Sequence, residues 1–363
     1  MKFNWTTGLR LLRAAAQVSL IALAALAIAA PLPPDAVERY YSNGLFPAIQ
    51  RIATAVSNLT AFPLIDLLIV AGLVFLVAVV MRAPAGARSK AFAAVLLLAR
   101  LTISASVVVL LFYVTWGLNY RRVPLIEKIP FDPKAVSPDA AHALAIRAVD
   151  QVNKLYPQAH KYAATSAELD PSLADGFAQA QRVLDVPSPA MWGRPKHSVL
   201  LDWYFKAAGV SGMTDPIFLE TLVVSDLLPF ERSHVIAHEW SHLAGFVDEG
   251  EANFVGWLTC MKASPAAQYS GWMFLYSELV PGLSDVERKE VTSRLDFGPR
   301  ADLLSASERF RRDVKPAIAN VGWMVYDRYL KANRVEAGRA SYAQVVRLIL
   351  GVRQNPDLFP QTP

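Results

Sequence analysis

Cysteine is almost missing from this sequence, because Cys260 is the only one in 363 residues. A lone cysteine cannot close an intrachain disulfide, and it excludes zinc ribbons and other sites built from several thiolates. Any metal ion would therefore have to be bound by histidine and carboxylate side chains.

Charged residues are also scarce. They make up 18% of the chain, whereas a soluble protein usually has about 25%. The net charge is +5, but residues 1–119 hold nine Lys/Arg against three Asp/Glu, a net of +6, and the remainder is close to neutral. No basic patch interleaved with aromatic residues is found, so we expect no nucleic-acid partner.

Three long apolar runs lie in the first third of the chain, at about residues 14–31, 64–81 and 101–120. Each can supply the roughly 20 residues that span a bilayer. Buried core helices are the alternative, but three runs with so few charges favour transmembrane helices. We therefore predict a membrane region over residues 1–120, with the lipid bilayer as a partner.

Arg100 interrupts the last apolar run. A charge at mid-membrane is costly, so we predict that the third span begins near Leu101 and that Arg100 shares an interface with Lys90. Trp116 and Tyr120 would then lie in the aromatic belt at the opposite interface.

Basic residues next to the spans predict the orientation. Positive residues prefer the cytoplasm, and they flank the first span on its N-terminal side and fill the second loop: Lys2, Arg10, Arg13, Arg82, Arg88, Lys90 and Arg100. Everything after Tyr120 would then lie outside the cytoplasm. The first run could instead be a cleaved signal peptide with small residues at 27–30, which leaves the downstream topology unchanged.

Residues 121–363 are enough for one substantial domain, which we predict to be mainly α-helical with a small β-sheet. Thr221–Val224 is short and β-branched, as expected for a strand. One helix should open near Glu231 and stop at Gly245, and the next should run from Glu249 to about Met261. Later helices are expected at residues 268–279, 284–295, 306–332 and 342–352. Ser284 and Glu287 have capping-box spacing at the start of the second of these, and Pro316 should kink or divide the third.

The motif His238-Glu239-Trp240-Ser241-His242 is the strongest chemical signal. Residues four apart share one face of a helix, so His238 and His242 can bind one metal ion, for which Zn²⁺ is the default. Glu239 lies beside the pair, where it can reach a water on the metal. This is the physical content of the H-E-x-x-H pattern.

A catalytic zinc site needs a third protein ligand. No histidine follows His242, so the third ligand must be an acid or one of His142, His160, His197 and His234. Here the chain resembles the zincin metallopeptidases, of which several membrane-bound branches supply a glutamate from a Glu-Ala-Asp/Asn pattern. Glu251-Ala252-Asn253 matches that pattern, so the resemblance implies His238, His242 and Glu251 as ligands. The short interval after His242 leaves Glu249 as a rival.

A closer resemblance is to a bacterial family of uncharacterised membrane proteins. It is carried by Trp116-Gly117-Leu118-Asn119-Tyr120-Arg121, by residues 238–260, and by Tyr269-Ser270-Gly271. That family has a few N-terminal spans followed by a zincin-like domain. The resemblance implies an α+β zincin-like domain outside a bacterial cytoplasmic (inner) membrane, but it implies no substrate.

The function expected from these residues is zinc-dependent hydrolysis of peptide bonds, with Glu239 as the general base. Tyr269, Tyr276 and Tyr326 are candidates to stabilise the oxyanion, and Asn253 could orient a histidine. The edge of the strand Thr221–Val224 could hold an extended peptide. The alternative is a catalytically silent zinc-binding scaffold in the cell envelope.

Overall fold

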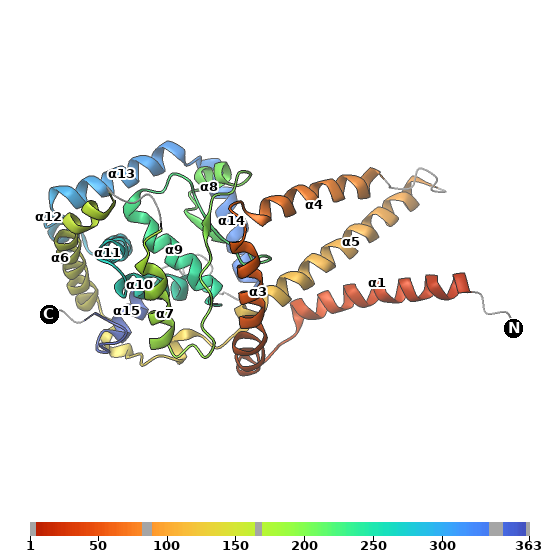
Figure 1. Ribbon diagram of the computed structural model, residues 1–363, viewed down its shortest axis with the longest axis horizontal. Helices are drawn as coiled ribbons and strands as arrows, with labels where there is room; N and C mark the ends of the chain where they lie inside the picture. The colour runs from red at the N-terminus through yellow and green to blue at the C-terminus, as the bar shows by residue number, and fades with distance from the viewer. Residues whose placement is uncertain (1–4, 82–88, 164–168, 334–343, 361–363) are drawn as a thin grey trace.

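The computed structural model describes residues 5–81, 89–163, 169–333 and 344–360. Three long helices project from one end of a mainly helical domain that contains a small three-stranded sheet (Figure 1). The predicted mainly helical class with a small sheet is confirmed.

The projecting helices are α1 (Trp5–Ala29), α4 (Leu64–Met81) and α5 (Lys90–Thr115). All three are long and apolar enough to cross a membrane, and few of their described side chains are buried. Lipid would cover such a surface, since exposed apolar helices of this length are not stable in water. Three of the basic residues used to predict the orientation, Lys2, Arg82 and Arg88, lie outside the described residues.

The third helix differs from its predicted bounds. It begins at Lys90, contains Arg100, and ends at Thr115 rather than near Tyr120. Trp116 is buried in the domain rather than exposed beside the helix. The apolar run in the sequence extends beyond the end of this helix because the residues after Thr115 pack into the domain core. Periodicity alone cannot distinguish a core residue from a residue in contact with lipid.

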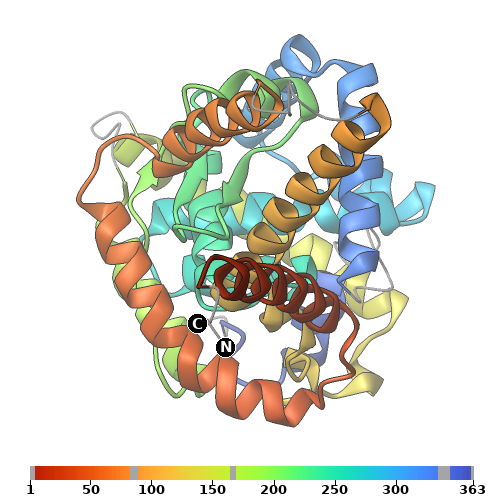
Figure 2. The same ribbon diagram turned by 90° about the vertical axis from the view of Figure 1, so that its right-hand side faces the viewer.

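The connection between α1 and α4 is itself helical, which we did not predict. It consists of α2 (Pro34–Ala36), the π-helix η1 (Val37–Leu45) and α3 (Phe46–Asn58). Viewed along the projecting helices, α3 runs across their direction at the end of the domain (Figure 2).

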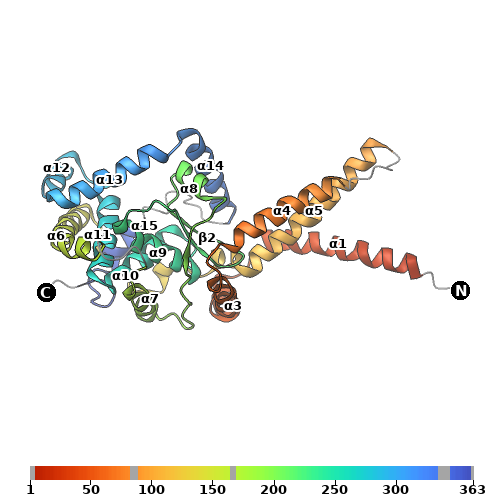
Figure 3. The ribbon, with the colours of Figure 1, turned by 45° about the horizontal axis from the view of Figure 1, so that its top comes forward.

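Three consecutive helices form the centre of the domain: α9 (Pro229–Leu243), α10 (Glu249–Met261) and α11 (Pro265–Leu279). Every residue of α10 is buried, because α9, α11, α7 and α15 pack around it (Figure 3). The helices packed outside this centre are α6 (Pro138–Ala163), α7 (Ser172–Val183), α8 (Asp202–Ala208), α12 (Asp285–Ser293), α13 (Phe297–Asp313), α14 (Pro316–Ala332) and α15 (Gln344–Val352).

The predicted division of the long C-terminal helix is confirmed: α13 ends at Asp313 and α14 begins with Pro316 at its first position. Proline has no amide hydrogen and fixes φ, so it is tolerated at the first turn of a helix but not inside one. The last helix was predicted from Tyr342, which lies outside the described residues.

The sheet has the strand order β1-β3-β2. β3 (Thr221–Val223) pairs in parallel with β1 (Pro195–Lys196) and antiparallel with β2 (Gly212–Thr214). The predicted strand is therefore present, but it is the central one. Its two edges are both paired, so our expectation that it offers an edge to a peptide is wrong.

A buried ion pair joins the domain to α4. Lys196 donates to Glu220 at 2.6 Å, and both side chains are completely buried. The Glu220 carboxylate also accepts hydrogen bonds from the backbone amides of Leu64 and Ile65, at the start of α4. A carboxylate is favourable at a helix N-terminus, so this pair fixes α4 to the sheet.

The end of α1 is held by a different residue. The guanidinium of Arg121 donates to the carbonyl oxygens of Ala27, Ile28 and Ala30. These carbonyls belong to the last turn of α1 and to the residue after it, where intrahelical partners are missing. Arg121 therefore caps the first projecting helix from the segment that follows the third.

Candidate metal centre

Helix α9 carries the H-E-x-x-H motif. Pro229 occupies its first turn, and the carboxylate of Glu231 accepts a hydrogen bond from the amide of Leu228, the residue before the helix. His238 and His242 point from the same face, with ring centroids 4.7 Å apart. The helix brings both imidazoles to one side, as the spacing predicts.

A tight turn returns the chain to this face. Gly245 has φ of +82°, a conformation that glycine adopts readily and other residues do not. Asp248 then caps α10, because its carboxylate accepts from the amides of Gly250 and Glu251. Glu249 is the first residue of the new helix and faces the histidines.

Three possible ligand atoms converge at this point. His238, His242 and Glu249 each offer one ligand atom, and these atoms lie within 4.8 Å of one another. Glu249 Oε2 is 3.3 Å from His238 Nε2 and 3.7 Å from His242 Nε2. Ligands bound to a tetrahedral zinc ion at about 2.0–2.1 Å lie roughly 3.3–3.4 Å apart. The spacing of the carboxylate from the imidazoles therefore suits one small divalent cation.

Glu251, the acid that the family pattern favoured, is placed elsewhere. Its carboxylate accepts a hydrogen bond from the amide of Leu125 at 2.5 Å, away from the histidines. Residues two apart on a helix point in nearly opposite directions, so Glu249 and Glu251 cannot both face α9. Burial raises the pKa of Glu251 to about 7. The structure therefore brings Glu249, the rival position, to the two histidines and places Glu251 away from them.

The orientation of His242 is fixed by a second hydrogen bond. Its Nδ1 lies 2.7 Å from the carbonyl oxygen of Phe246, which can only accept, so Nδ1 carries the hydrogen and Nε2 faces the cluster. Metal-binding histidines are commonly held in this way by an acceptor behind the ring. Nδ1 of His238 is buried and has no hydrogen-bond partner among the described residues.

Glu249 and the two histidines shift one another's pKa values. Burial acts to raise the pKa of Glu249, but hydrogen bonds and charges from His238 and His242 outweigh it and hold the pKa below its ordinary range. Burial acts to lower the pKa of His242, but Glu249 raises it to about 9. The ionised carboxylate therefore attracts positive charge between the two rings, and a bound cation would supply the same charge.

Glu239 lies beside this cluster and is held by the edge strand of the sheet. Its Oε2 accepts a hydrogen bond from the hydroxyl of Thr214 on β2 at 2.9 Å. A Cβ at Gly212 would lie 2.6 Å from Glu239 Oε1, so a side chain at this position would displace the Glu239 carboxylate. Burial raises the pKa of Glu239. Sequence reasoning missed Thr214 and Gly212, because no local motif marks the partner of a distant helix.

Helix α10 touches α9 directly behind the motif. A Cβ at Gly256 would lie 2.9 Å from the backbone nitrogen of His238 and 3.0 Å from its Cα. The absence of a side chain at this position lets the two helices approach, which brings Glu249 within reach of the imidazoles.

The segment from Trp116 to Arg121 packs against the cluster. The indole of Trp116 donates to the carbonyl oxygen of His242 at 3.4 Å, and the two rings meet edge to face. Tyr120 packs edge to face on Tyr329, which stacks on Tyr326. The hydroxyl of Tyr326 in turn donates to Glu249 Oε1. Two aromatic residues of the motif that carried the closer family resemblance, Trp116 and Tyr120, therefore pack beside the candidate metal centre.

The three tyrosines proposed for oxyanion stabilisation have different positions. Tyr326 contacts the cluster through Glu249, whereas the Tyr269 hydroxyl donates to Asp302 at 2.5 Å and Tyr276 is buried in α11. Tyr326 is thus the candidate that the geometry favours.

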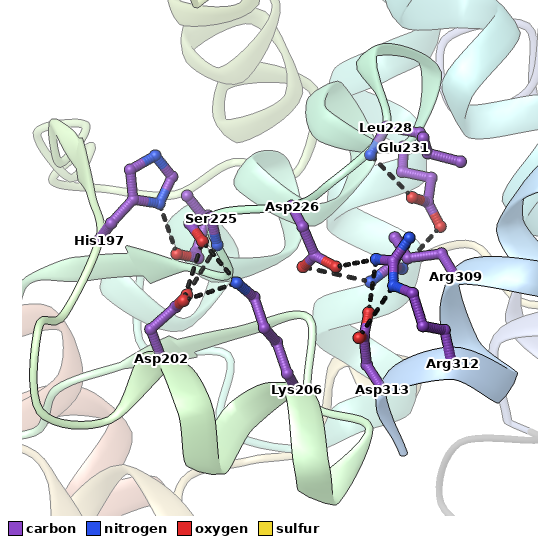
Figure 4. A network of polar contacts seen from close by, with 11 residues as sticks. His197, Asp202, Lys206, Ser225, Asp226, Leu228, Glu231, Arg309, Arg312 and Asp313 are labelled. Carbon is purple, nitrogen blue, oxygen red and sulfur yellow. Dashed lines mark hydrogen bonds and ion pairs between the residues drawn. The ribbon is translucent and has the colours of Figure 1, made fainter.

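The other histidines do not join the cluster. His234 stacks on Phe274. Asn253, which we expected to orient a histidine, is buried in α10. His197 Nδ1 lies 2.8 Å from the carbonyl oxygen of Val223, beside a polar network that ties α13 to the start of α9 (Figure 4). The remaining two face acids elsewhere: His142 lies near Glu290, and His160 near Asp302.

The family of the chain follows from a model match over residues 41–350. The chain belongs to the family described as "Protein of unknown function (DUF3810)". No curated protein and no solved structure matches it. The matched residues include α3, two of the three projecting helices and all residues of the candidate metal centre. The family therefore shares both the helices and the domain, not the domain alone.

Proposed function

We propose that the protein is a membrane-anchored, zinc-dependent metallopeptidase of the zincin type. The observation that supports this most is the convergence of His238, His242 and Glu249, with the buried carboxylate of Glu239 beside them. A purely structural zinc site has no need of a second carboxylate next to its ligands. The proposed orientation places this site outside the cytoplasm of a bacterial cell.

His238, His242 and Glu249 would hold the zinc ion. When bound, zinc supplies a Lewis acid that polarises a carbonyl oxygen and makes a nearby water more acidic. Tyr326 lies next to the cluster and would donate its hydroxyl hydrogen to the developing oxyanion once Glu249 is engaged with the cation.

Glu239 would act as the general base. It would accept a proton from the water that attacks the scissile carbonyl carbon and then transfer this proton to the leaving amine nitrogen. Burial raises the pKa of this carboxylate, which makes it a stronger base for the first proton transfer than an exposed glutamate would be.

The substrate backbone would lie along β2. In the described sheet this strand is at the edge, and it contacts Glu239 through Thr214 and Gly212. An extended peptide can add to such an edge by main-chain hydrogen bonds. The central strand β3, where we first expected the peptide, cannot bind it in this way because both of its edges are paired.

The test compares Glu239→Gln with Glu231→Gln, a matched change on the same helix outside the site. Full-length protein is loaded with zinc in detergent, its zinc content is measured, and cleavage of a proteome-derived peptide mixture is followed by mass spectrometry. We expect Glu239→Gln to keep zinc and to lose hydrolysis by roughly 100-fold or more, and Glu231→Gln to retain both.

Two results would count against the proposal. Hydrolysis by Glu239→Gln at the parental rate would rule out its role as the base. A parent protein that binds zinc but cleaves no peptide would favour the envelope scaffold instead.

A further inference from the structure

Exposed apolar side chains gather at the end of the domain from which the projecting helices leave. They come from three separate elements, and we call them the apolar rim: Ile52, Val56, Leu59 and Phe62 on and after α3; Val199, Leu200 and Trp203 at α8; and Val321, Met324 and Val325 on α14. Monomeric soluble proteins rarely expose a large contiguous apolar patch without a function for it.

The rim residues on the helices follow a helical period. Ile52, Val56 and Leu59 fall on one face of α3, and Val321 and Val325 fall four apart on α14. Both helices run across the direction of the projecting helices rather than along it (Figures 1 and 2). This is the arrangement of amphipathic helices that lie in the plane of a membrane surface.

Direct contacts place two parts of the rim near the outer ends of the spans, and the chain itself joins the third part to a span. Asp66, in the first turn of α4, accepts from the hydroxyl of Ser198 and the amide of Val199. At the other side, Tyr113 in the last turn of α5 donates to Asn333, just after α14. The third part, α3, leads directly into α4 along the chain.

The metal centre lies next to the same level. Trp116, the residue that follows α5, donates to the carbonyl oxygen of His242. Tyr326, whose hydroxyl donates to Glu249, is the neighbour of the rim residue Val325 in sequence. Trp116 therefore links the end of α5 to the ligand candidate His242. On the other side of the site, the rim helix α14 carries Tyr326.

We infer that the apolar rim rests in the interface of the bilayer, and that the substrate is a polypeptide segment held at the membrane surface. The inference about substrate depends on the proposed peptidase function, whereas the contact of the rim with lipid does not. A site at the height of the membrane interface can bind a juxtamembrane segment or a lipid-anchored peptide while that peptide stays at the bilayer surface.

The lipid contact is tested with single cysteines that carry an environment-sensitive fluorophore. Ile52→Cys, Val199→Cys and Val325→Cys each report one part of the rim. Val286→Cys on α12, at the far end of the domain in Figure 1, is the control, because Val286 and Val199 are 80% and 84% exposed. Cys260 is buried, so the parent chain measures background labelling.

The labelled full-length proteins are reconstituted in vesicles of phosphatidylcholine and phosphatidylglycerol, with and without nitroxide-labelled lipid. Apolar faces of interfacial helices sit about 5–10 Å deep, so nitroxide lipid should reduce emission from the three rim positions by roughly half. The control should change no more than the parent background. Equal quenching at Val199→Cys and Val286→Cys would overturn the lipid contact.

The substrate class is tested in the same vesicles with one fluorogenic peptide mixture in three forms: soluble, lipid-anchored through a single residue, and lipid-anchored through a long Gly/Ser spacer. Tethering alone raises the effective concentration of both anchored forms, so the comparison that decides is between the spacers. We expect the short-spacer form to be cleaved at least as fast as the long-spacer form, and the soluble form roughly tenfold more slowly.

The outcomes separate the two proposals. Cleavage that needs the long spacer means that the site stands away from the bilayer, which contradicts the inference and leaves the peptidase intact. Cleavage of none of the three forms contradicts the peptidase and the substrate class with it, and the fluorophore measurement alone then decides the lipid contact.

Discussion

Two buried polar clusters in the domain differ in whether their acidic side chains are paired with a lysine or arginine. The joint cluster, Lys196 and Glu220, contains one cation and one anion, and both side chains are completely buried. The hydroxyl of Ser57 and the first amides of α4 complete the hydrogen bonds of the carboxylate. This cluster is electrically and geometrically complete without any ligand.

The metal cluster is not complete in this sense. His238, His242 and Glu249 converge without a lysine or arginine among the three, and the buried carboxylate of Glu239 adjoins them. Nδ1 of His238 has no partner among the described residues. Buried carboxylates are stable when they are paired or coordinate a metal. We therefore expect a cation at the second cluster, whereas the first holds the fold together without one.

The largest expected effect is on zinc affinity. Glu249→Ala removes a ligand candidate, so we expect the affinity for zinc to fall by roughly 100-fold or more. Glu251→Ala should leave zinc binding within a few-fold of the parent, because Glu251 accepts from Leu125 instead. Competition with a chromogenic chelator measures both, and loss of zinc in Glu251→Ala alone would restore the family-based assignment.

The next effect concerns the joint cluster. Glu220→Ala leaves a buried lysine unpaired, which should reduce the free energy of unfolding by about 3–5 kcal/mol. Glu290→Ala, which breaks the exposed pair with Arg294, should change it by no more than about 0.5 kcal/mol. Thermal unfolding of the metal-free proteins gives the two values. If Glu220→Ala instead removed zinc without lowering stability, the distinction between the clusters would fail.

A smaller effect concerns the ion pair of Glu38 with Arg122 and Lys128. Burial acts to raise the pKa of Glu38, but these two cations lower it from 4.5 to about 2. A lowered pKa stabilises the fold above pH 4.5, and this contribution is lost as the pH falls from 4.5 toward 2. Allowing for partial exposure, we expect about 2 kcal/mol at neutral pH.

The measurement for this pair compares the parent with Glu38→Gln across that pH range. The parent should be the more stable at pH 7, and the difference should shrink steadily below pH 4.5. A difference that stays constant down to pH 2 would mean that the charge of Glu38 is not what stabilises the fold.

Much of this architecture could be predicted from local patterns. Hydrophobic runs predicted three apolar helices, β-branched residues predicted β3, and capping chemistry located Gly245, Pro316 and the start of α12. These signals depend on neighbours in sequence, which is why one chain suffices to find them.

What could not be predicted depends on contacts between distant segments. The choice between Glu249 and Glu251 is set by the first turn of α10, where a shift of two residues reverses the direction of the side chain. The approach of Thr214 to Glu239 depends on β2, which is only three residues long and has no periodicity to detect. Trp116 was misplaced because an apolar residue after a span fits a membrane belt and a domain core equally well.

The cap that Arg121 places on α1 has a consequence for the order of assembly in the cell. Synthesis at about 5–20 residues per second requires roughly 5 to 20 seconds to pass from the end of α1 to residue 121. During that interval the carbonyls of Ala27, Ile28 and Ala30 lack their guanidinium partner. The C-terminal end of α1 therefore gains this cap only after the third projecting helix has been synthesised.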